Sequence, residues 1–146
     1  MNTKNISRSI GFCSQVDNGL INATVYDNLK FFAKMKGISN DLVEFEVGRV
    51  MVRFNLLPFK DSLTDNLSGG WKRKLSFAIA LLGNPKIIIM DEPTSGMDKI
   101  TRKLFWDLVE TLKKEKKTLI FTTQFLDEAE SLSDRIAVLS KGNCVI

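Results

Sequence analysis

Hydrophobic and polar positions in the first half of the chain predict one short strand followed by two helices. SIGFCSQ, residues 9–15, is an apolar run that leads into a polar loop, which is typical of a buried strand. Thr24 followed by Asp27 forms a capping-box pattern, and we expect a helix from there to its C-terminal cap at Gly37. A second helix is expected after Asn40. Its apolar positions recur at helical spacing at Val43, Val47, Val50, Met51 and Phe54.

Apolar runs alternate with amphipathic stretches in the second half of the chain. A helix is expected from Ser68 to Gly83, with one apolar stripe made by Trp71, Leu75, Ala78, Ile79 and Leu82. The remaining elements are expected in the order of a strand at 86–91, a helix after Asp98, a strand at 118–123, a short helix at 126–132, a strand at 135–139 and a hairpin turn at 141–143. The run at 86–91 is continuously apolar, so we expect this strand to be covered on both faces of a parallel sheet.

The order of these elements predicts the fold class. Strands that alternate with helices over short connections favour βαβ units, so we expect an α/β fold with a parallel sheet. The stretch from about 24 to 66 contains helices alone and is expected to form a helical subdomain, followed by an α/β core at about 67–146. The length of 146 residues fits a single domain.

Composition narrows the class of protein without identifying a site. Hydrophobic residues make up 44% of the chain, enough for a folded core, and the net charge of +4 is mild. Histidine is absent, which removes His-based catalysis and His-based metal binding. Cys13 and Cys144 have no metal-binding or redox spacing, so we expect two free thiols. No apolar run approaches the roughly 18 residues of a transmembrane helix, and we expect a soluble chain.

The most apolar short run ends in two adjacent carboxylates. IIIMDEPTSGMD, residues 87–98, places Asp91 and Glu92 directly after the expected strand, where Pro93 favours an extended Glu92. An unpaired buried carboxylate costs several kcal/mol. At the carboxyl end of a parallel strand, however, it can face a ligand or a metal ion. Taken alone, the pair is equally compatible with the start of a simple turn.

Four motifs together resemble the ATPases of the ATP-binding cassette (ABC) family. IIIMDEP is similar to a Walker B motif with its catalytic glutamate, and LSGGWKRKLSFAIALLGNP is similar to the signature motif. TSGMD resembles the D-loop and IGFCSQ the Q-loop strand, and all four follow the family's order. IGFCSQ and TTQFLDEAESLSDRIAVLSKG look most like subfamily A, whose members mostly move lipids. The resemblance implies a P-loop NTPase-type parallel sheet, N-terminally incomplete, with a helical subdomain.

The resemblance also implies a role for each matching residue. Asp91 would hold Mg²⁺, largely through water, and Glu92 would accept a proton from, or orient, the water that attacks the γ-phosphate of ATP. Gln15 would reach both Mg²⁺ and that water through its amide, with an ordinary surface glutamine as the alternative. The D-loop residues Ser95, Gly96, Met97 and Asp98 would lie at a dimer contact, and Asp98 could equally cap the next helix.

Ser68, Gly69 and Gly70 form the expected nucleotide-binding surface of the signature motif. A helix N-terminus presents backbone N–H groups, and glycine lets the backbone approach a phosphate closely. In the family this surface contacts the γ-phosphate held by the opposite subunit of a head-to-tail dimer. A capped turn without a ligand is the alternative. Trp71 departs from the glutamine common at its position, and we expect it to pack in the apolar stripe.

Two departures from the family pattern limit the expected activity. Gln124 stands where the family usually places a catalytic histidine, and because an amide cannot become a cation we expect slow hydrolysis. No G-x-x-x-x-G-K-[ST] P-loop, which would cradle the phosphates, occurs in the sequence. We therefore expect weak ATP binding by this chain alone, as either a fragment or a shortened form.

The leading interpretation is the nucleotide-binding domain of an ABC transporter that couples ATP hydrolysis to transport, with lipid as one candidate substrate. Its implied partners are ATP, Mg²⁺, a second nucleotide-binding domain and transmembrane domains outside this chain. These partners imply membrane association at the cytoplasmic face. The helical stretch at 24–65 would then face the membrane domains, consistent with exposed Phe31 and Phe59, although both could equally be core residues.

Two other functions remain open from the sequence. One is a non-catalytic regulatory half that lends residues 68–70 to a partner's complete site. The other is a soluble ATPase that acts on nucleic acid or ribosomes, suggested by basic runs at 72–74 and 113–117. Both runs fall at polar faces or ends of amphipathic helices and lack interleaved aromatic residues, so we expect no nucleic-acid partner.

Overall fold

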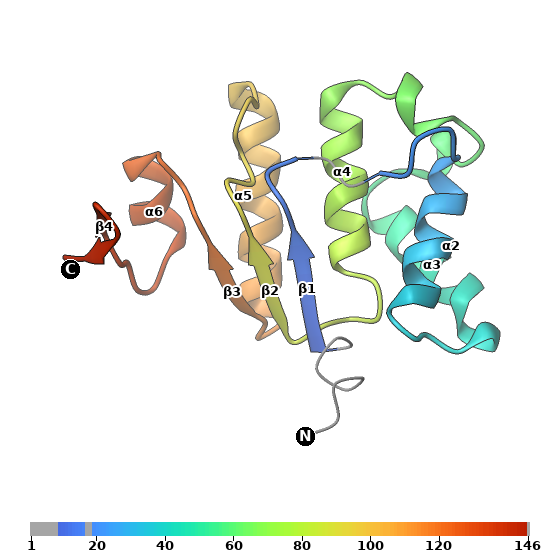
Figure 1. Ribbon diagram of the computed structural model, residues 1–146, viewed down its shortest axis with the longest axis horizontal. Coiled ribbons are helices and arrows are strands. Elements are labelled where there is room, and N and C mark those ends of the chain that lie inside the picture. Colours follow the sequence, from blue (N-terminus) through green and yellow to red (C-terminus); the bar gives the residue numbers. More distant parts are fainter. Residues whose placement is uncertain (1–8, 17–18, 146) are drawn as a thin grey trace.

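A three-stranded parallel sheet lies at the centre of the computed structural model, which describes residues 9–16 and 19–145. Its strands are β1 (Ile10–Cys13), β2 (Ile87–Met90) and β3 (Thr118–Phe121), in the spatial order β1-β2-β3. All three run in the same direction and end at one edge of the sheet (Figure 1). The α/β fold with a parallel sheet is therefore confirmed.

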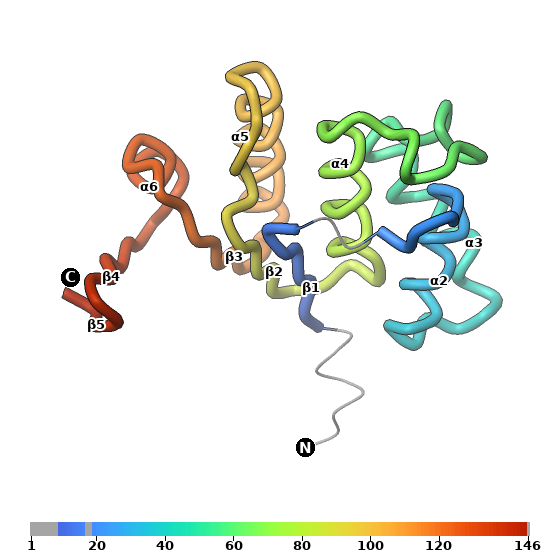
Figure 2. Tube along the Cα trace, turned by 45° about the horizontal axis from the view of Figure 1, so that its top comes forward, coloured from blue at the N-terminus to red at the C-terminus, as the bar shows by residue number. Residues whose placement is uncertain are grey.

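Two long helices cover one face of this sheet. Helix α4 (Gly69–Ala80) packs beside β1, and α5 (Lys99–Lys114) packs beside β3 (Figure 2). Ile88 and Met90 of β2 are buried, whereas Ile87 and Ile89 are only partly buried. The expectation that this strand is covered on both faces is therefore wrong for the described residues, because successive side chains alternate and the helices lie on one side.

The packing of α4 on the sheet depends on a glycine in β1. A Cβ atom added at Gly11 would lie 2.3 Å from the backbone oxygen of Ala80, closer than real Cβ contacts allow. Glycine is therefore required where the end of α4 approaches the strand backbone.

The stretch that was expected to form a helical subdomain contains α2 (Val25–Met35), α3 (Asn40–Arg53) and two short 3₁₀ turns, η1 (Leu57–Phe59) and η2 (Thr64–Asn66). The Thr24 side chain accepts a hydrogen bond from the Asp27 N–H, as a capping residue should. Gly37 follows α2 with a positive φ of 74°, as expected of a C-terminal cap. Helix α3 ends at Arg53, before Pro58, and its expected apolar face is buried at Val43, Val47, Val50, Met51 and Phe54.

Two aromatic residues of this region behave differently. Phe31 on α2 is exposed. Phe59 is partly buried and its ring lies 4.3 Å from that of Trp71, so Phe59 is a packing residue and not an exposed one. The same contact confirms the expected packing role of Trp71.

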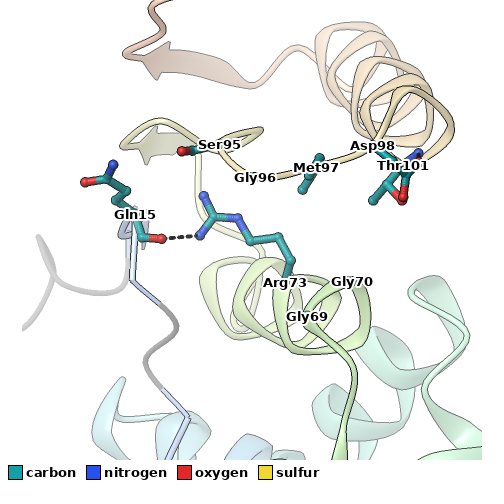
Figure 3. A pocket seen from close by; sticks show the side chains of 9 residues that line it. All are labelled: Gln15, Gly69, Gly70, Arg73, Ser95, Gly96, Met97, Asp98 and Thr101. Atoms are coloured by element: carbon teal, nitrogen blue, oxygen red, sulfur yellow. Dashed lines mark hydrogen bonds between the residues drawn. The ribbon is translucent and has the colours of Figure 1, made fainter.

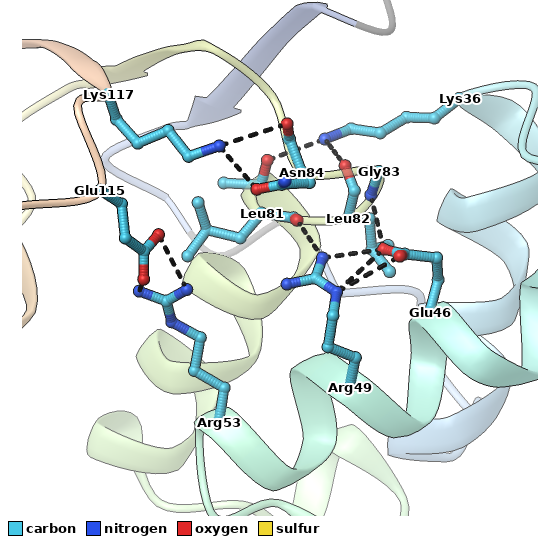
Figure 4. Close-up of polar contacts among 11 residues, drawn as sticks. Lys36, Glu46, Arg49, Arg53, Leu81, Leu82, Gly83, Asn84, Glu115 and Lys117 are labelled. Atoms are coloured by element: carbon cyan, nitrogen blue, oxygen red, sulfur yellow. Dashed lines mark hydrogen bonds and ion pairs between the residues drawn. The ribbon is translucent and has the colours of Figure 1, made fainter. Parts of the chain in front are cut away.

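The C-terminal end of α4 is tied to the helical subdomain by two cationic side chains (Figure 4). Lys36 Nζ donates to the carbonyls of Ala80 at 2.8 Å and Leu82 at 3.1 Å. Arg49 Nη2 donates to the carbonyl of Leu81 at 2.9 Å. These bonds satisfy carbonyl groups that have no partner within the helix itself.

The end of the chain differs from expectation. Helix α6 (Leu126–Leu132) lies where predicted, but residues 135–138 form no strand. Instead β4 (Leu139–Ser140) pairs antiparallel with β5 (Asn143–Cys144) around the expected turn. The predicted third strand of this half is therefore wrong, because that segment pairs locally in a small hairpin and not with the central sheet.

Cys13 is buried and Cys144 is exposed, and no disulfide joins them in the described part of the chain. Among the described residues, none of the helices combines the length and the apolar character needed to cross a bilayer.

Candidate functional site

The loops that follow the three strands bring the candidate residues together. Gln15 follows β1, Asp91 and Glu92 follow β2, and Gln124 follows β3. The Gln15 Nε2 atom donates to Glu92 Oε2 at 3.0 Å, although the two residues are 77 positions apart. The structure therefore brings the Gln15 amide into contact with one of the two carboxylates, while the role of Gln15 toward Mg²⁺ and water stays a prediction.

Thr122 is a part of this site that the sequence analysis missed. Its hydroxyl donates to Asp91 Oδ1 at 2.6 Å and accepts from the Glu92 N–H at 2.9 Å. Because Met90 pairs with Phe121, the parallel register places Thr122 opposite Asp91. A hydroxyl residue one position beyond the end of the neighbouring strand could have indicated this contact.

The backbone of Glu92 adopts a conformation that residues with side chains rarely take. Its φ is +40°, in the left-handed region. The N–H of Glu92 donates to Thr122, and its carbonyl accepts from Arg73 Nη2 at 3.1 Å. Pro93 was expected to favour an extended Glu92, and that expectation is wrong, because hydrogen bonds on both sides hold the residue in this strained geometry.

Arg73 is also a residue that the sequence analysis misassigned. It belongs to the basic run at 72–74, which we expected on a solvated helix face, yet it is buried. Its guanidinium group donates to backbone carbonyls of the loops after β1 and β2, and Figure 3 shows the bond to the carbonyl of Gln15. Periodicity alone could have indicated this, because Arg73 lies four residues before the buried Phe77 on α4.

The N-terminus of α4 is exposed beside these loops. Ser68, Gly69 and Gly70 all lie at the surface, and a Cβ atom added at either glycine would meet no atom within 4 Å. Ser68 has the backbone conformation of a capping residue, but its side chain makes no capping hydrogen bond. The predicted cap is therefore confirmed in backbone conformation only, and the helix end is open to an approaching group.

The segment that resembles the D-loop follows β2 and leads into α5. Asp98 Oδ1 accepts from the N–H groups of Ile100 and Thr101, each at 2.9 Å, and so caps α5. These bonds, with that from Thr101 as the largest cause, hold the pKa of the Asp98 carboxyl below its usual value. A cleft of about 210 Å³ lies beside this segment (Figure 3). It is lined by Gln15, Gly69, Gly70, Arg73, Ser95, Gly96, Met97, Asp98 and Thr101.

A buried carboxylate, that of Glu128, supports the same loops. The Glu128 side chain, with no exposed surface, accepts from Thr94 at 2.9 Å, from Thr123 at 2.7 Å and from Trp106 Nε1 at 3.1 Å. It thereby joins the segment before the D-loop to the segment before Gln124. Gln124 itself is exposed, and no hydrogen bond joins its side chain to Asp91 or Glu92 in the described part of the chain.

The side chains at this edge could bind a divalent cation together with water and substrate phosphates. They do not form a site in which protein groups alone surround the ion. Within residues 9–16 and 19–145, no cluster of three or more His, Cys, Asp or Glu side chains could hold a metal ion. Mg²⁺ characteristically keeps several waters and takes one or two carboxylates together with substrate phosphates. Exposed Asp91, with the Gln15 amide at the adjacent Glu92, fits that pattern.

Comparison with known sequences gives a consistent assignment. Residues 1–95 match the family described as ABC transporter. The chain is 44% identical over 139 residues to the Homo sapiens protein named ATP-binding cassette sub-family A member 9, covering 95% of this chain and 8% of that protein. It is 44% identical over 137 residues to the Rattus norvegicus Phospholipid-transporting ATPase ABCA3, covering 94% and 8%. It is also 44% identical over 135 residues to the Homo sapiens Cholesterol transporter ABCA5, covering 92% and 8%.

Comparison with solved structures agrees. The fold matches cbiO1 from Clostridium perfringens, described as part of the ABC transporter complex cbiONQ, with a TM-score of 0.83 and 30% sequence identity. The match covers 97% of this chain and 57% of that one. The chain spans about 8% of the length of the curated relatives named above.

Proposed function

This chain belongs to the ABC transporter family, and from that premise we propose that it forms the catalytic and signature-motif part of a nucleotide-binding domain. In this function, ATP hydrolysis at the edge of the sheet drives transport by transmembrane domains at the cytoplasmic face of a membrane. The observation that carries the proposal is the 3.0 Å hydrogen bond between Gln15 and Glu92, beside Asp91. This contact joins the segments that resemble the Q-loop and the Walker B motif, both of which act in ATP hydrolysis in the ABC family.

Each side chain at this edge has a distinct chemical task. Asp91 would hold Mg²⁺ largely through water, and the ion would supply positive charge against the phosphates of ATP. The Glu92 carboxylate accepts a proton from the attacking water or orients it. The Gln15 amide donates to Glu92 in this structure and keeps its carbonyl oxygen available for the water or the metal. Thr122 fixes the Asp91 carboxylate and the Glu92 backbone, so the two acids keep separate directions.

The signature motif has a complementary task. The exposed α4 N-terminus at Ser68, Gly69 and Gly70 would contact the γ-phosphate held by a second nucleotide-binding domain in a head-to-tail dimer. The D-loop, which lines the same cleft, would lie at that dimer contact. This arrangement makes hydrolysis depend on assembly of two domains.

Lipid is the substrate class that we propose for transport. Two relatives at 44% identity are named as phospholipid and cholesterol transporters. The test is ATP-dependent transfer of a fluorescent phospholipid and of a fluorescent sterol in proteoliposomes that contain the complete transporter. The proposal is supported if the complete transporter transfers the phospholipid or the sterol and the Glu92→Gln variant does not. ATP hydrolysis without transfer of either would contradict the lipid assignment and leave the ATPase assignment intact.

A regulatory half without chemistry of its own is the second candidate. Gln124 favours it, because the family's usual histidine donor is replaced by an amide that cannot carry a charge. The hydrogen-bonded Gln15–Glu92 pair favours a working site instead. The two functions differ in one readout: the Glu92→Gln change slows hydrolysis by the assembly in the catalytic case and leaves it unchanged in the regulatory case.

A further inference from the structure

A single buried side chain joins the signature helix to both loops that carry the hydrolytic residues. Arg73 lies on α4 and is only 6% exposed, unlike the solvated lysines expected in a basic run. Its Nη1 atom donates to the carbonyls of Ser14 at 2.7 Å and Gln15 at 3.1 Å. Both carbonyls belong to the backbone that carries the Gln15 side chain, so Arg73 fixes the backbone from which the Gln15 amide projects (Figure 3).

The other two guanidinium nitrogens hold the second loop. Nη2 donates to the carbonyl of Glu92 at 3.1 Å, and Nε donates to the carbonyl of Pro93 at 2.8 Å. Glu92 is the residue with a positive φ of 40°, and its carbonyl bond to Arg73 opposes relaxation to a commoner conformation. Arg73 therefore contacts the backbone on both sides of the Gln15–Glu92 hydrogen bond.

The chemistry of this contact explains why arginine occupies the position. No carboxylate pairs with Arg73 among the described residues, so four backbone carbonyl dipoles compensate its buried charge. The planar guanidinium group presents several donors in fixed directions, which lets one side chain reach two separate loops. Lysine has three donors on a single nitrogen and cannot reproduce this spread.

We propose that Arg73 is a positioning residue for ATP hydrolysis, which holds the Gln15 amide and the Glu92 carboxylate in their mutual geometry and couples that geometry to α4. This inference rests on the proposed function. Arg73 is three residues beyond Gly70 on the same helix. A phosphate seated at the α4 N-terminus therefore acts on the helix that also anchors Glu92.

The test compares Arg73→Met with Arg49→Met in the complete transporter. Arg49 is a matched control, because it also donates to a carbonyl at α4 but at the opposite end of the helix, at Leu81. We measure the rate of ATP hydrolysis, the melting temperature, and the affinity for ATP in a Glu92→Gln background where turnover is blocked. A residue that acts only in packing would lower rate, affinity and melting temperature together.

We expect Arg73→Met to lower the rate of hydrolysis at least about tenfold, the change that follows from roughly one lost charged hydrogen bond in the transition state. ATP affinity in the Glu92→Gln background stays within about twofold, and Arg49→Met keeps its rate within about threefold at a similar loss of melting temperature. If Arg73→Met does not fold, Arg73→Lys and Arg49→Lys replace the pair, with an expected loss of about threefold for Arg73→Lys alone.

Two results overturn the inference. One is a rate for the Arg73 variant equal to that of the Arg49 variant at matched stability, and the other is a loss of ATP affinity that parallels the loss of rate. Failure of the proposed function is distinguishable from both, because in that case the unmodified transporter hydrolyses no ATP or is insensitive to Glu92→Gln.

Discussion

At the scale of single residues, the site depends on side chains that hold other side chains. Asp91 and Glu92 are adjacent in the sequence, and different neighbouring residues form hydrogen bonds with each carboxylate. Thr122 bonds the carboxylate of the first and the backbone N–H of the second. Gln15 then bonds the carboxylate of the second. Separate partners therefore give two neighbouring acids separate tasks.

Replacing Thr122 with valine should slow hydrolysis without changing the shape of the residue. Thr122→Val removes the donor to Asp91 and the acceptor for the strained Glu92 backbone, so we expect a fall of about tenfold or more in the rate of ATP hydrolysis. The rate is measured in the complete transporter at saturating Mg²⁺-ATP. Thr122→Ser, which keeps the hydroxyl, is the control and should stay within about threefold. Equal rates for the two variants would count against this role.

Gln124 should limit the rate of the chemical step. Replacing it with histidine restores a donor that can carry a positive charge, and we expect turnover to rise, up to about the hundredfold effect known for one transition-state donor. Gln124→Asn keeps an amide and should bring no increase. Steady-state hydrolysis by the complete transporter separates the two variants. An unchanged rate in the histidine variant would contradict the proposed role of this position.

At the scale of elements, α4 is the helix on which the other parts converge. Its N-terminus is exposed at Ser68–Gly70, its middle carries Arg73, and its C-terminal carbonyls accept hydrogen bonds from Lys36 and Arg49 (Figure 4). It also approaches β1 closely at Gly11. A displacement of α4 would therefore disturb the sheet, the helical subdomain and the site together.

The Lys36 contact predicts a dependence of stability on pH. Burial lowers the pKa of Lys36 to about 8. Between this value and the unfolded pKa of roughly 10.4, the unfolded chain binds a proton that the folded chain does not, so the free energy of unfolding should rise with pH. The rise from this group is on the order of 3 kcal/mol at most.

Urea unfolding of the wild type and of Lys36→Met between pH 7 and about 10.5 isolates this contribution. The difference in unfolding free energy should shift in favour of the wild type as pH increases. Lys34→Met, at an exposed position in the last turn of α2, controls for general effects of removing a charge. Parallel curves for wild type and Lys36→Met would show that Lys36 keeps an ordinary pKa.

The approach of α4 to β1 predicts the effect of one added methyl group. Gly11→Ala places Cβ 2.3 Å from the Ala80 oxygen, a backbone atom that cannot move without the helix, and we expect a loss of about 2 kcal/mol or more in unfolding free energy. Gly48→Ala on α3, where Cβ meets no atom within 4 Å, should instead stabilise by roughly 0.5–1 kcal/mol. Chemical denaturation measures both changes. A neutral Gly11→Ala variant would contradict the described packing.

At the scale of the whole molecule, local patterns predicted the elements and distant contacts decided the site. Helical periodicity correctly located α2, α3, α4, α5 and α6. The reason is that the apolar positions of a helix follow one another within a single short stretch of sequence. The strand expected at 135–139 is wrong because an apolar run does not show which segment a strand pairs with, and here Leu139–Ser140 pairs with the adjacent Asn143–Cys144. Likewise the contacts of Arg73 and Thr122 were missed, because the periodicity and strand-end position that mark these residues do not identify the distant loops that they contact.

The assignment of the site combines motif and geometry. Asp91, Glu92 and Gln15 were predicted from their resemblance to a family, and the structure brings Gln15 and Glu92 into contact. The roles of Ser68, Gly69, Gly70 and of the D-loop at a dimer contact remain proposals, because they concern a second domain. Hydrolysis by the assembled transporter is the property on which all of these roles depend.

The most direct test of the account is therefore the rate of ATP hydrolysis by the complete transporter with Glu92→Gln. Glu130→Gln, which changes an exposed acid on α6, serves as the matched control. Loss of the group that accepts the proton from water should lower the rate by at least about a hundredfold, while the control stays within about twofold of the unmodified protein. A Glu92→Gln transporter that retains more than half of the unmodified rate would contradict the account.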